Sequence, residues 1–150
     1  TDSATKIIEV ETDYRIRDVE ALADYVYPPH DFAAPIASGS HLFDAMVIIP
    51  CSMGTLSAVA CGSSDTLITR AADVCLKEKR RLIVVPRETP LSLIQIRNMA
   101  AAAEAGAIIL PACPAFYSRP KSLDELVDVL VGRVLDLLGL ENDSYQRWKG

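Results

Sequence analysis

Three short apolar runs constrain most strongly how this chain can fold. They read AMVIIP (45–50), RLIVVP (81–86) and AGAIILP (105–111). Their Val, Ile and Leu residues do not alternate with polar ones, which is typical of parallel strands that are covered on both faces. We therefore expect three buried parallel strands at these positions.

Amphipathic helices are predicted between and after these strands. Apolar residues mark one face of 65–78, a second helix over 91–104 ends near Gly106, and a third follows Ser122 and stops at Gly139. Serine favours the start of a helix and glycine its end. Strands that alternate with helices indicate an α/β fold with right-handed crossovers.

The N-terminal third is less regular. Residues 3–10 and 17–25 have helical patterns, whereas 27–40 is rich in Pro, Gly and Ser and is predicted to be a loop. A loop of this length in a compact domain is usually functional or mobile.

Composition narrows the class of protein. The chain has 150 residues, half of them hydrophobic, which fits one domain over residues 1–150. A net charge of −5 argues against a nucleic-acid partner, and no apolar run is long enough to span a bilayer. The cysteines at positions 51, 61, 75 and 113 form no metal-binding pattern. Each lies in an apolar context, so we expect buried, reduced thiols of a cytoplasmic protein. The alternative for Cys51, which precedes a helix, is a thiol of lowered pKa.

Polar groups follow each of the three predicted strands. They are Ser52, Gly54 and Thr55 after the first, Arg87 and Glu88 after the second, and Tyr117 and Arg119 after the third. Ligands of open α/β sheets bind beyond the carboxyl ends of the strands. Arginine and hydroxyl groups suit a phosphate-bearing ligand, and a glutamate beside them suits acid–base chemistry. Each feature alone is also explained by a capped turn, a surface ion pair or a packed loop.

Several longer stretches resemble one known family. PCSMGTLSAVA (50–60), RAADVCLKEKRRLIVVPRETPLS (70–92) and the segment from NMAAAAEAG to GRVLD (98–136) are similar to the UbiX/Pad-type flavin prenyltransferases. The resemblance extends over nearly the whole chain, from ETD at 11–13 to QRW at 146–148.

This resemblance implies a three-layer flavodoxin-like or Rossmann-like parallel sheet, bound FMN and a homododecamer. It also implies transfer of a dimethylallyl group from dimethylallyl phosphate to N5 and C6 of reduced FMN, without a metal. The prenylated FMN would serve a UbiD-type decarboxylase as its partner.

The resemblance also implies roles for individual residues. Its FMN-binding positions match Thr1, Ser52, Met53, Gly54, Thr55 and Arg87. Its prenyl-phosphate contacts match Lys77, Arg87, Tyr117 and Arg133, and the nearest equivalent of an aromatic wall is Phe32. Glu88, Glu11 and Ser52 are the candidate catalytic residues.

Two alternatives and one departure remain open at the level of sequence. The alternatives are an FMN-dependent decarboxylase of the cysteine-decarboxylase group and a non-catalytic flavin-binding subunit of an aromatic acid decarboxylase. The place where such decarboxylases carry Asn reads PCSMGT here, without Asn.

This sequence departs from the family at its start. Family members open with a strand and a GASG-like glycine loop, and no such glycine cluster occurs among the seven glycines here. We therefore expect the N-terminal part of the family domain to be absent, so that these residues alone bind FMN poorly and leave an apolar sheet edge exposed.

Overall fold

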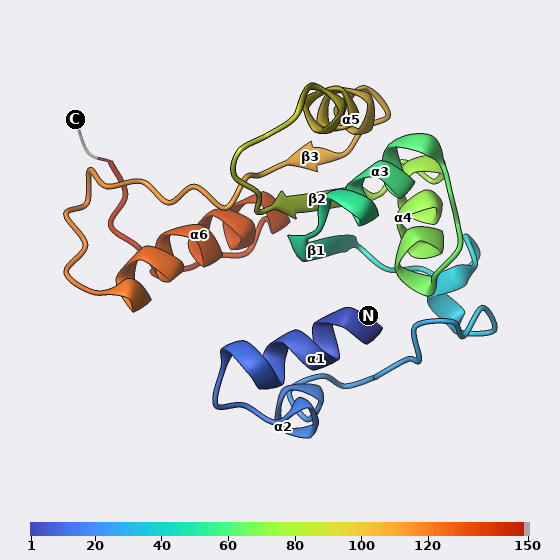
Figure 1. The fold of residues 1–150 in the computed structure, drawn as a ribbon, viewed down its shortest axis with the longest axis horizontal. Helices are drawn as coiled ribbons and strands as arrows, with labels where there is room; N and C mark the ends of the chain where they lie inside the picture. Colours follow the sequence, from blue (N-terminus) through green and yellow to red (C-terminus); the bar gives the residue numbers. More distant parts are fainter. Residues whose placement is uncertain (149–150) are drawn as a thin grey trace.

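A computed structural model describes residues 1–148, which form six α-helices, one short 3-10 helix and three strands (Figure 1). The first part of the chain contains α1 (Asp2–Glu11), α2 (Ile16–Glu20) and the 3-10 helix η1 (Pro35–Ala37). The α/β part follows in the order β1 (Ala45–Cys51), α3 (Met53–Cys61), α4 (Leu67–Lys77), β2 (Arg81–Pro86), α5 (Leu93–Glu104), β3 (Ile108–Ile109) and α6 (Leu123–Leu138).

The three strands form one parallel sheet in the order β1-β2-β3. Ala45 lies opposite Arg81 at one end of the β1–β2 pair, and Cys51 lies opposite Pro86 at the other. All three strands therefore end at the same edge of the sheet, which we call the carboxyl edge.

Strand β2 lies in the centre of the core and separates two layers of helices. Its Leu82 and Val84 pack with α3, α4 and α5, whereas Ile83 and Val85 pack with α6 on the opposite face. All four side chains are fully buried, and burial of each contributes about 1.5–3 kcal/mol. The arrangement has three layers and confirms the predicted α/β class (Figure 1).

Hydroxyl side chains fix where the helices of this α/β part begin. In each of α3, α4, α5 and α6 the residue before the helix accepts a hydrogen bond from a backbone amide in the first turn; these residues are Ser52, Thr66, Ser92 and Ser122. Such a cap contributes about 1 kcal/mol. The predicted helix boundaries near Ser122 and Gly139 are therefore confirmed, and Gly139 adopts the left-handed conformation that ends α6.

Two strand predictions need correction. The predicted third strand, 105–111, is reduced to Ile108–Ile109, because the amides of Gly106 and Ala107 bond back to carbonyls of α5 and end that helix. The first strand is not buried along its whole length: Ile48 and Cys51 are buried, whereas Ile49 and Pro50 near its end are exposed. Only β2 is buried as predicted.

The N-terminal helices α1 and α2 lie beside each other and contribute no buried residue (Figure 1). Helix α2 is shorter than the predicted 17–25, because the amides of Leu22 and Ala23 bond to carbonyls three residues back instead of four. Residues 27–40 form the predicted loop, interrupted by η1. This loop is tied to the start of α4, where the Leu67 amide donates to the Pro29 carbonyl at 2.7 Å.

Across residues 1–148, no helix combines the length and the apolar character that a bilayer crossing requires. Within the same residues, no three potential metal ligands lie close together.

Candidate functional site

The segments that follow the three strands lie side by side at the carboxyl edge. Because Cys51 pairs with Pro86, the next residues, Ser52 and Arg87, leave adjacent strands at the same level. On the other side of β2, the Ala112 amide donates to the Pro86 carbonyl at 3.0 Å. The expectation that the strand-end segments share one edge is confirmed.

The turn after β1 presents free backbone donors. The Ser52 hydroxyl accepts from the Thr55 amide at 3.2 Å and lies 3.1 Å from the Thr55 hydroxyl. Within residues 1–148 the amides of Met53 and Gly54 have no hydrogen-bond partner, as expected for the first turn of a helix. A side chain on Gly54 would meet no atom closer than 3.9 Å, so the backbone there is open to a ligand. The turn can bind an anion or the polar edge of a ring.

Arg87 and Glu88 are exposed directly beside this turn. The Glu88 carboxylate accepts from the Thr89 amide at 3.1 Å. Over the described residues the Arg87 guanidinium forms neither an ion pair nor a hydrogen bond, so the alternative of an Arg87–Glu88 surface pair is not realised. Arg87 thus retains its donors for a bound anion.

A cavity of about 200 Å³ lies between the segment after β3 and helix α6. Its wall is aliphatic, with Leu110, Val129 and Leu130, and its polar groups include Tyr117 and Arg133. An aliphatic pocket that carries a guanidinium and a phenol suits a short hydrocarbon chain attached to a phosphate. Two of the predicted prenyl-phosphate contacts therefore meet in one cavity.

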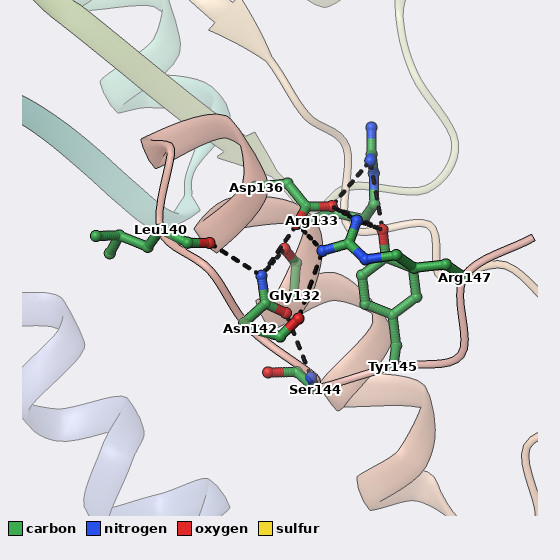
Figure 2. A network of polar contacts seen from close by, with 8 residues as sticks. All are labelled: Gly132, Arg133, Asp136, Leu140, Asn142, Ser144, Tyr145 and Arg147. Carbon is green, nitrogen blue, oxygen red and sulfur yellow. Dashed lines mark hydrogen bonds and ion pairs between the residues drawn. The ribbon is translucent and has the colours of Figure 1, made fainter.

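Behind Arg133 lies a polar network centred on Asp136 (Figure 2). The Asp136 carboxylate accepts from the Tyr145 hydroxyl at 2.7 Å, from Arg147 Nη2 at 2.6 Å, from Asn142 Nδ2 at 3.0 Å and from Arg133 Nη1 at 3.1 Å. Hydrogen bonds from Arg147 and Tyr145 hold the pKa of Asp136 well below its usual range.

Sequence reasoning missed this network. Its signal is present, since Gly132 interrupts an otherwise apolar and charged helix, and a glycine in a helix interior usually has a packing reason. The partner that explains the glycine, Tyr145, lies beyond the end of the helix and is not marked by any periodicity.

Lys77 does not lie with the other predicted phosphate contacts within one chain. Helix α4 runs antiparallel to the strands, so its last residue, Lys77, lies near the start of β2. There Lys77 forms an ion pair with Glu78, and both side chains lie next to Gly39 of the loop. The six residues of β2 separate it from Arg87, a distance of roughly 20 Å.

Three further predicted residues lie on the N-terminal segment and are exposed. The Thr1 hydroxyl accepts from the Ala4 amide and begins α1, Glu11 ends that helix, and Phe32 is half exposed in the loop before η1. Among residues 1–148 no hydrogen bond or ion pair connects Thr1, Glu11 or Phe32 to the carboxyl edge.

The cysteines divide into two pairs. Cys51 and Cys75 are buried as predicted, whereas Cys61 and Cys113 are exposed, which corrects the prediction for those two. Burial raises the pKa of Cys51 to about 11, because the thiolate loses its hydration. The alternative of a low-pKa thiol at this helix start is therefore wrong.

The carboxyl edge fits an FMN molecule. A donor set for phosphate, or for the oxygen and nitrogen rim of a flavin, is formed by the Met53 and Gly54 amides, the Ser52 and Thr55 hydroxyls and the Arg87 guanidinium.

Comparison with known proteins agrees with this fit. The family model described as Flavoprotein matches residues 1–135, so the fold and the site define a flavoprotein. A flavin prenyltransferase UbiX from Thermoplasma acidophilum is 55% identical over 148 residues, which are 99% of this chain and 82% of that protein.

Two solved structures are similar over the whole chain. AnUbiX in complex with FMN and dimethylallyl pyrophosphate has a TM-score of 0.98 and 51% identity, and the match covers 100% of this chain and 80% of that one. A dodecameric FMN-dependent UbiX-like decarboxylase from Escherichia coli has a TM-score of 0.97 and 49% identity, with 100% and 81% covered. The chain belongs to the family of UbiX flavin prenyltransferases.

Proposed function

We propose that this chain transfers a dimethylallyl group from dimethylallyl phosphate to reduced FMN and so makes prenylated FMN for a UbiD-type decarboxylase. The observation that carries the proposal is the aliphatic cavity with Tyr117 and Arg133, next to a free Arg87 and an open helix start at the carboxyl edge. The identity of 55% to a flavin prenyltransferase supports the same reaction.

FMN would be held by the turn after β1. The amides of Met53 and Gly54, with the hydroxyls of Ser52 and Thr55, would donate to its polar groups, and Arg87 would offset negative charge. Thr1, at the start of α1, is a further candidate contact by resemblance. When bound, reduced FMN supplies the electron-rich ring atoms that accept the dimethylallyl group.

The leaving phosphate would be stabilised by cationic and phenolic donors. As the C–O bond breaks, the phosphate departs with the bonding electron pair, and Arg133, Arg87 and Tyr117 would donate to its oxygens. The cavity wall would hold the hydrocarbon chain away from water. Phe32 is the candidate for an aromatic surface near the developing cation, by resemblance.

Proton movement would fall to Glu88. It is exposed beside Arg87 at the carboxyl edge, and its one hydrogen-bond partner within residues 1–148 is the neighbouring Thr89 amide. An exposed carboxylate in this position can accept or return a proton. Glu11 and Ser52 are further candidates for the same task by resemblance.

The protein would assemble as a homododecamer in the cytoplasm. The dodecameric UbiX-like relative supports a homododecamer for this chain, and the unburied helices α1 and α2 offer apolar surface for contacts between copies. Free cysteines at positions 51, 61, 75 and 113 suit a reducing compartment such as the cytoplasm.

The reaction is tested on the full-length protein under anaerobic conditions with reduced FMN and dimethylallyl phosphate. Mass spectrometry of the extracted flavin should show the dimethylallyl adduct. If the flavin is unchanged and carbon dioxide is released from an aromatic acid or a C-terminal cysteine, the protein is instead a decarboxylase.

The role of Glu88 is tested by Glu88→Gln. We expect adduct formation to fall by about 10²–10⁴-fold, as for loss of a general acid–base group, while FMN binding is kept. Glu104→Gln is the matched control, because Glu104 is equally exposed but ends α5 at the opposite edge of the sheet. Full activity of Glu88→Gln would remove Glu88 from the mechanism, whereas a wild-type protein that binds FMN but forms no adduct and releases no carbon dioxide would favour a binding subunit without turnover.

A further inference from the structure

The C-terminal segment, residues 140–148, folds back onto α6 after Gly139 ends that helix (Figure 2). The Tyr145 ring lies against the helix at Gly132, where an added Cβ would come within 2.3 Å of the ring. Glycine at this point is therefore needed for close packing of the segment, which we call the C-terminal strap.

Asp136 connects the strap to the helix. It accepts from Tyr145 and Asn142, and the Arg147 guanidinium binds it through two nitrogens, Nη1 at 3.1 Å and Nη2 at 2.6 Å. The Asp136 side chain is only 16% exposed, so these bonds are partly shielded from water. Forked arginine–carboxylate pairs of this kind are among the stronger and more directional polar contacts in proteins.

The same carboxylate also holds Arg133 of the cavity. Arg133 Nη1 donates to Asp136 Oδ2 at 3.1 Å and lies 3.4 Å from the Tyr145 hydroxyl, while its Nε and Nη2 have no protein partner within residues 1–148. One side of the guanidinium is therefore fixed and the other is available to an anion.

Charge balance keeps Arg133 attractive to an anion. Two guanidinium groups, those of Arg133 and Arg147, surround the single carboxylate of Asp136. The carboxylates of Asp136 and Asp143 both act on Arg147, whereas Asp136 is the one carboxylate that acts on Arg133 among the described residues, and it is shared with Arg147. The Arg133 guanidinium therefore keeps part of its positive charge beside the cavity.

The strap also reaches the second polar residue of the cavity. The ring of Trp148 meets the ring of Tyr117 edge-to-face, with 5.5 Å between centroids and an interplanar angle of 83°. This geometry is favourable for aromatic pairs. Both polar residues of the cavity are thus contacted from the strap side.

We propose that Asp136 and Tyr145 are positioning residues that orient Arg133 for a phosphate in the cavity, while Trp148 of the same C-terminal strap packs against Tyr117. The inference rests on the proposed function for the identity of the substrate, but anion binding by the cavity is independent of it. Neither residue touches the substrate in this scheme.

The test uses the full-length, FMN-loaded protein and two probes, inorganic phosphate and dimethylallyl phosphate, titrated by calorimetry. Asp136→Asn removes the carboxylate that orients Arg133, and we expect this loss of orientation to raise the Kd of each probe about tenfold even though the substitution adds positive charge beside the cavity. Hydrogen exchange of residues 140–148 should become faster in the same variant. Asp128→Asn is the control on the same helix, since Asp128 is exposed and has no polar partner among the described residues, and it should change neither quantity.

Tyr145→Phe separates positioning from folding. It keeps the ring on Gly132 but removes the hydroxyl that contacts Asp136 and Arg133. We expect an approximately threefold higher KM for dimethylallyl phosphate with the KM for FMN unchanged, and a melting temperature lowered only by the loss of one hydrogen bond.

Three outcomes would overturn the inference: a wild-type protein that binds neither probe, probe affinities in Asp136→Asn equal to wild type, or a Tyr145→Phe protein that is unaltered. A wild-type protein that binds phosphate but forms no prenylated flavin would contradict the proposed function alone.

Discussion

At the scale of single residues, burial decides which of the four thiols can react. Cys51 is 1% exposed at the end of β1, whereas Cys113 lines the cavity and is exposed. Burial raises the pKa of Cys51 from 9.0 to about 11 and also raises that of Cys75, because a thiolate in an apolar core is not solvated. A position before a helix start is thus not enough to make a thiol acidic.

We expect alkylation at pH 8.5 to modify Cys61 and Cys113 and to spare Cys51 and Cys75 until the protein unfolds. Peptide mapping after brief treatment with iodoacetamide measures this directly. Rapid labelling of Cys51 in the folded protein would contradict the buried position.

The raised pKa of Cys51 also predicts how stability depends on pH. Its folded-state value of about 11 is above the ordinary value of 9.0, so its contribution to the free energy of unfolding is complete below pH 9 and is lost as the pH rises toward 11. Urea unfolding at pH 8, 9.5 and 10.5 should show this decrease, and Cys51→Ala should flatten it.

At the scale of elements, α6 is shaped by a contact that lies outside it. A glycine within a helix costs about 1 kcal/mol relative to alanine. A glycine is nevertheless needed at position 132, because the Tyr145 ring occupies the space where a Cβ would lie. The helix and the C-terminal strap therefore form one packing unit.

Gly132→Ala should have opposite effects in two backgrounds. In the wild type the new methyl group meets the ring and should lower the free energy of unfolding by about 1–3 kcal/mol. In Tyr145→Ala the ring is gone, and the Asn142 Oδ1 atom, 3.0 Å from the added Cβ, belongs to a side chain that can shift, so the same change should raise it by up to about 1 kcal/mol. Urea unfolding of the four proteins gives both numbers, and the same sign in both backgrounds would exclude the Tyr145 contact as the cause.

Local patterns predicted most of the elements but not the contacts between distant segments. The apolar runs located β1 and β2, and Ser122 and Gly139 bounded α6, because strand burial and helix capping act over a few residues. The predicted third strand was too long, because the amides of Gly106 and Ala107 form the hydrogen bonds that end α5. In the candidate site, the sequence predicts that Ser52 and Arg87 are neighbours, because both directly follow adjacent parallel strands. The strap depends on pairings across 9 and 11 residues, Tyr145 and Arg147 with Asp136, which have no periodic signal.

At the scale of the whole molecule, helix direction places Lys77 at the edge opposite to Arg133. The right-handed crossover from β1 to β2 requires α4 to run antiparallel to the strands, so its last residue lies beside the start of β2. If Lys77 binds the phosphate, as the resemblance implies, it must do so in a neighbouring copy of the chain.

Mixing two inactive variants tests this arrangement. Lys77→Ala and Arg133→Ala should each lose most prenyltransferase activity, because each removes a charge from the leaving group. After dissociation and reassembly of the mixture, sites that combine an intact Lys77 of one copy with an intact Arg133 of another should restore part of the activity. Mixtures that stay as inactive as either variant would place the two residues in the same copy or remove Lys77 from the site.

Strand β3 has only two paired residues, so the wall of the cavity that faces α6 is formed by the irregular segment 110–117 and not by a strand. Insertions or exchanges in that segment can enlarge or narrow the pocket while the hydrogen bonds between strands stay intact. If the cavity holds the hydrocarbon chain of the donor, as proposed above, changes in this stretch would alter which donors fit while the strand pairing that stabilises the sheet is kept.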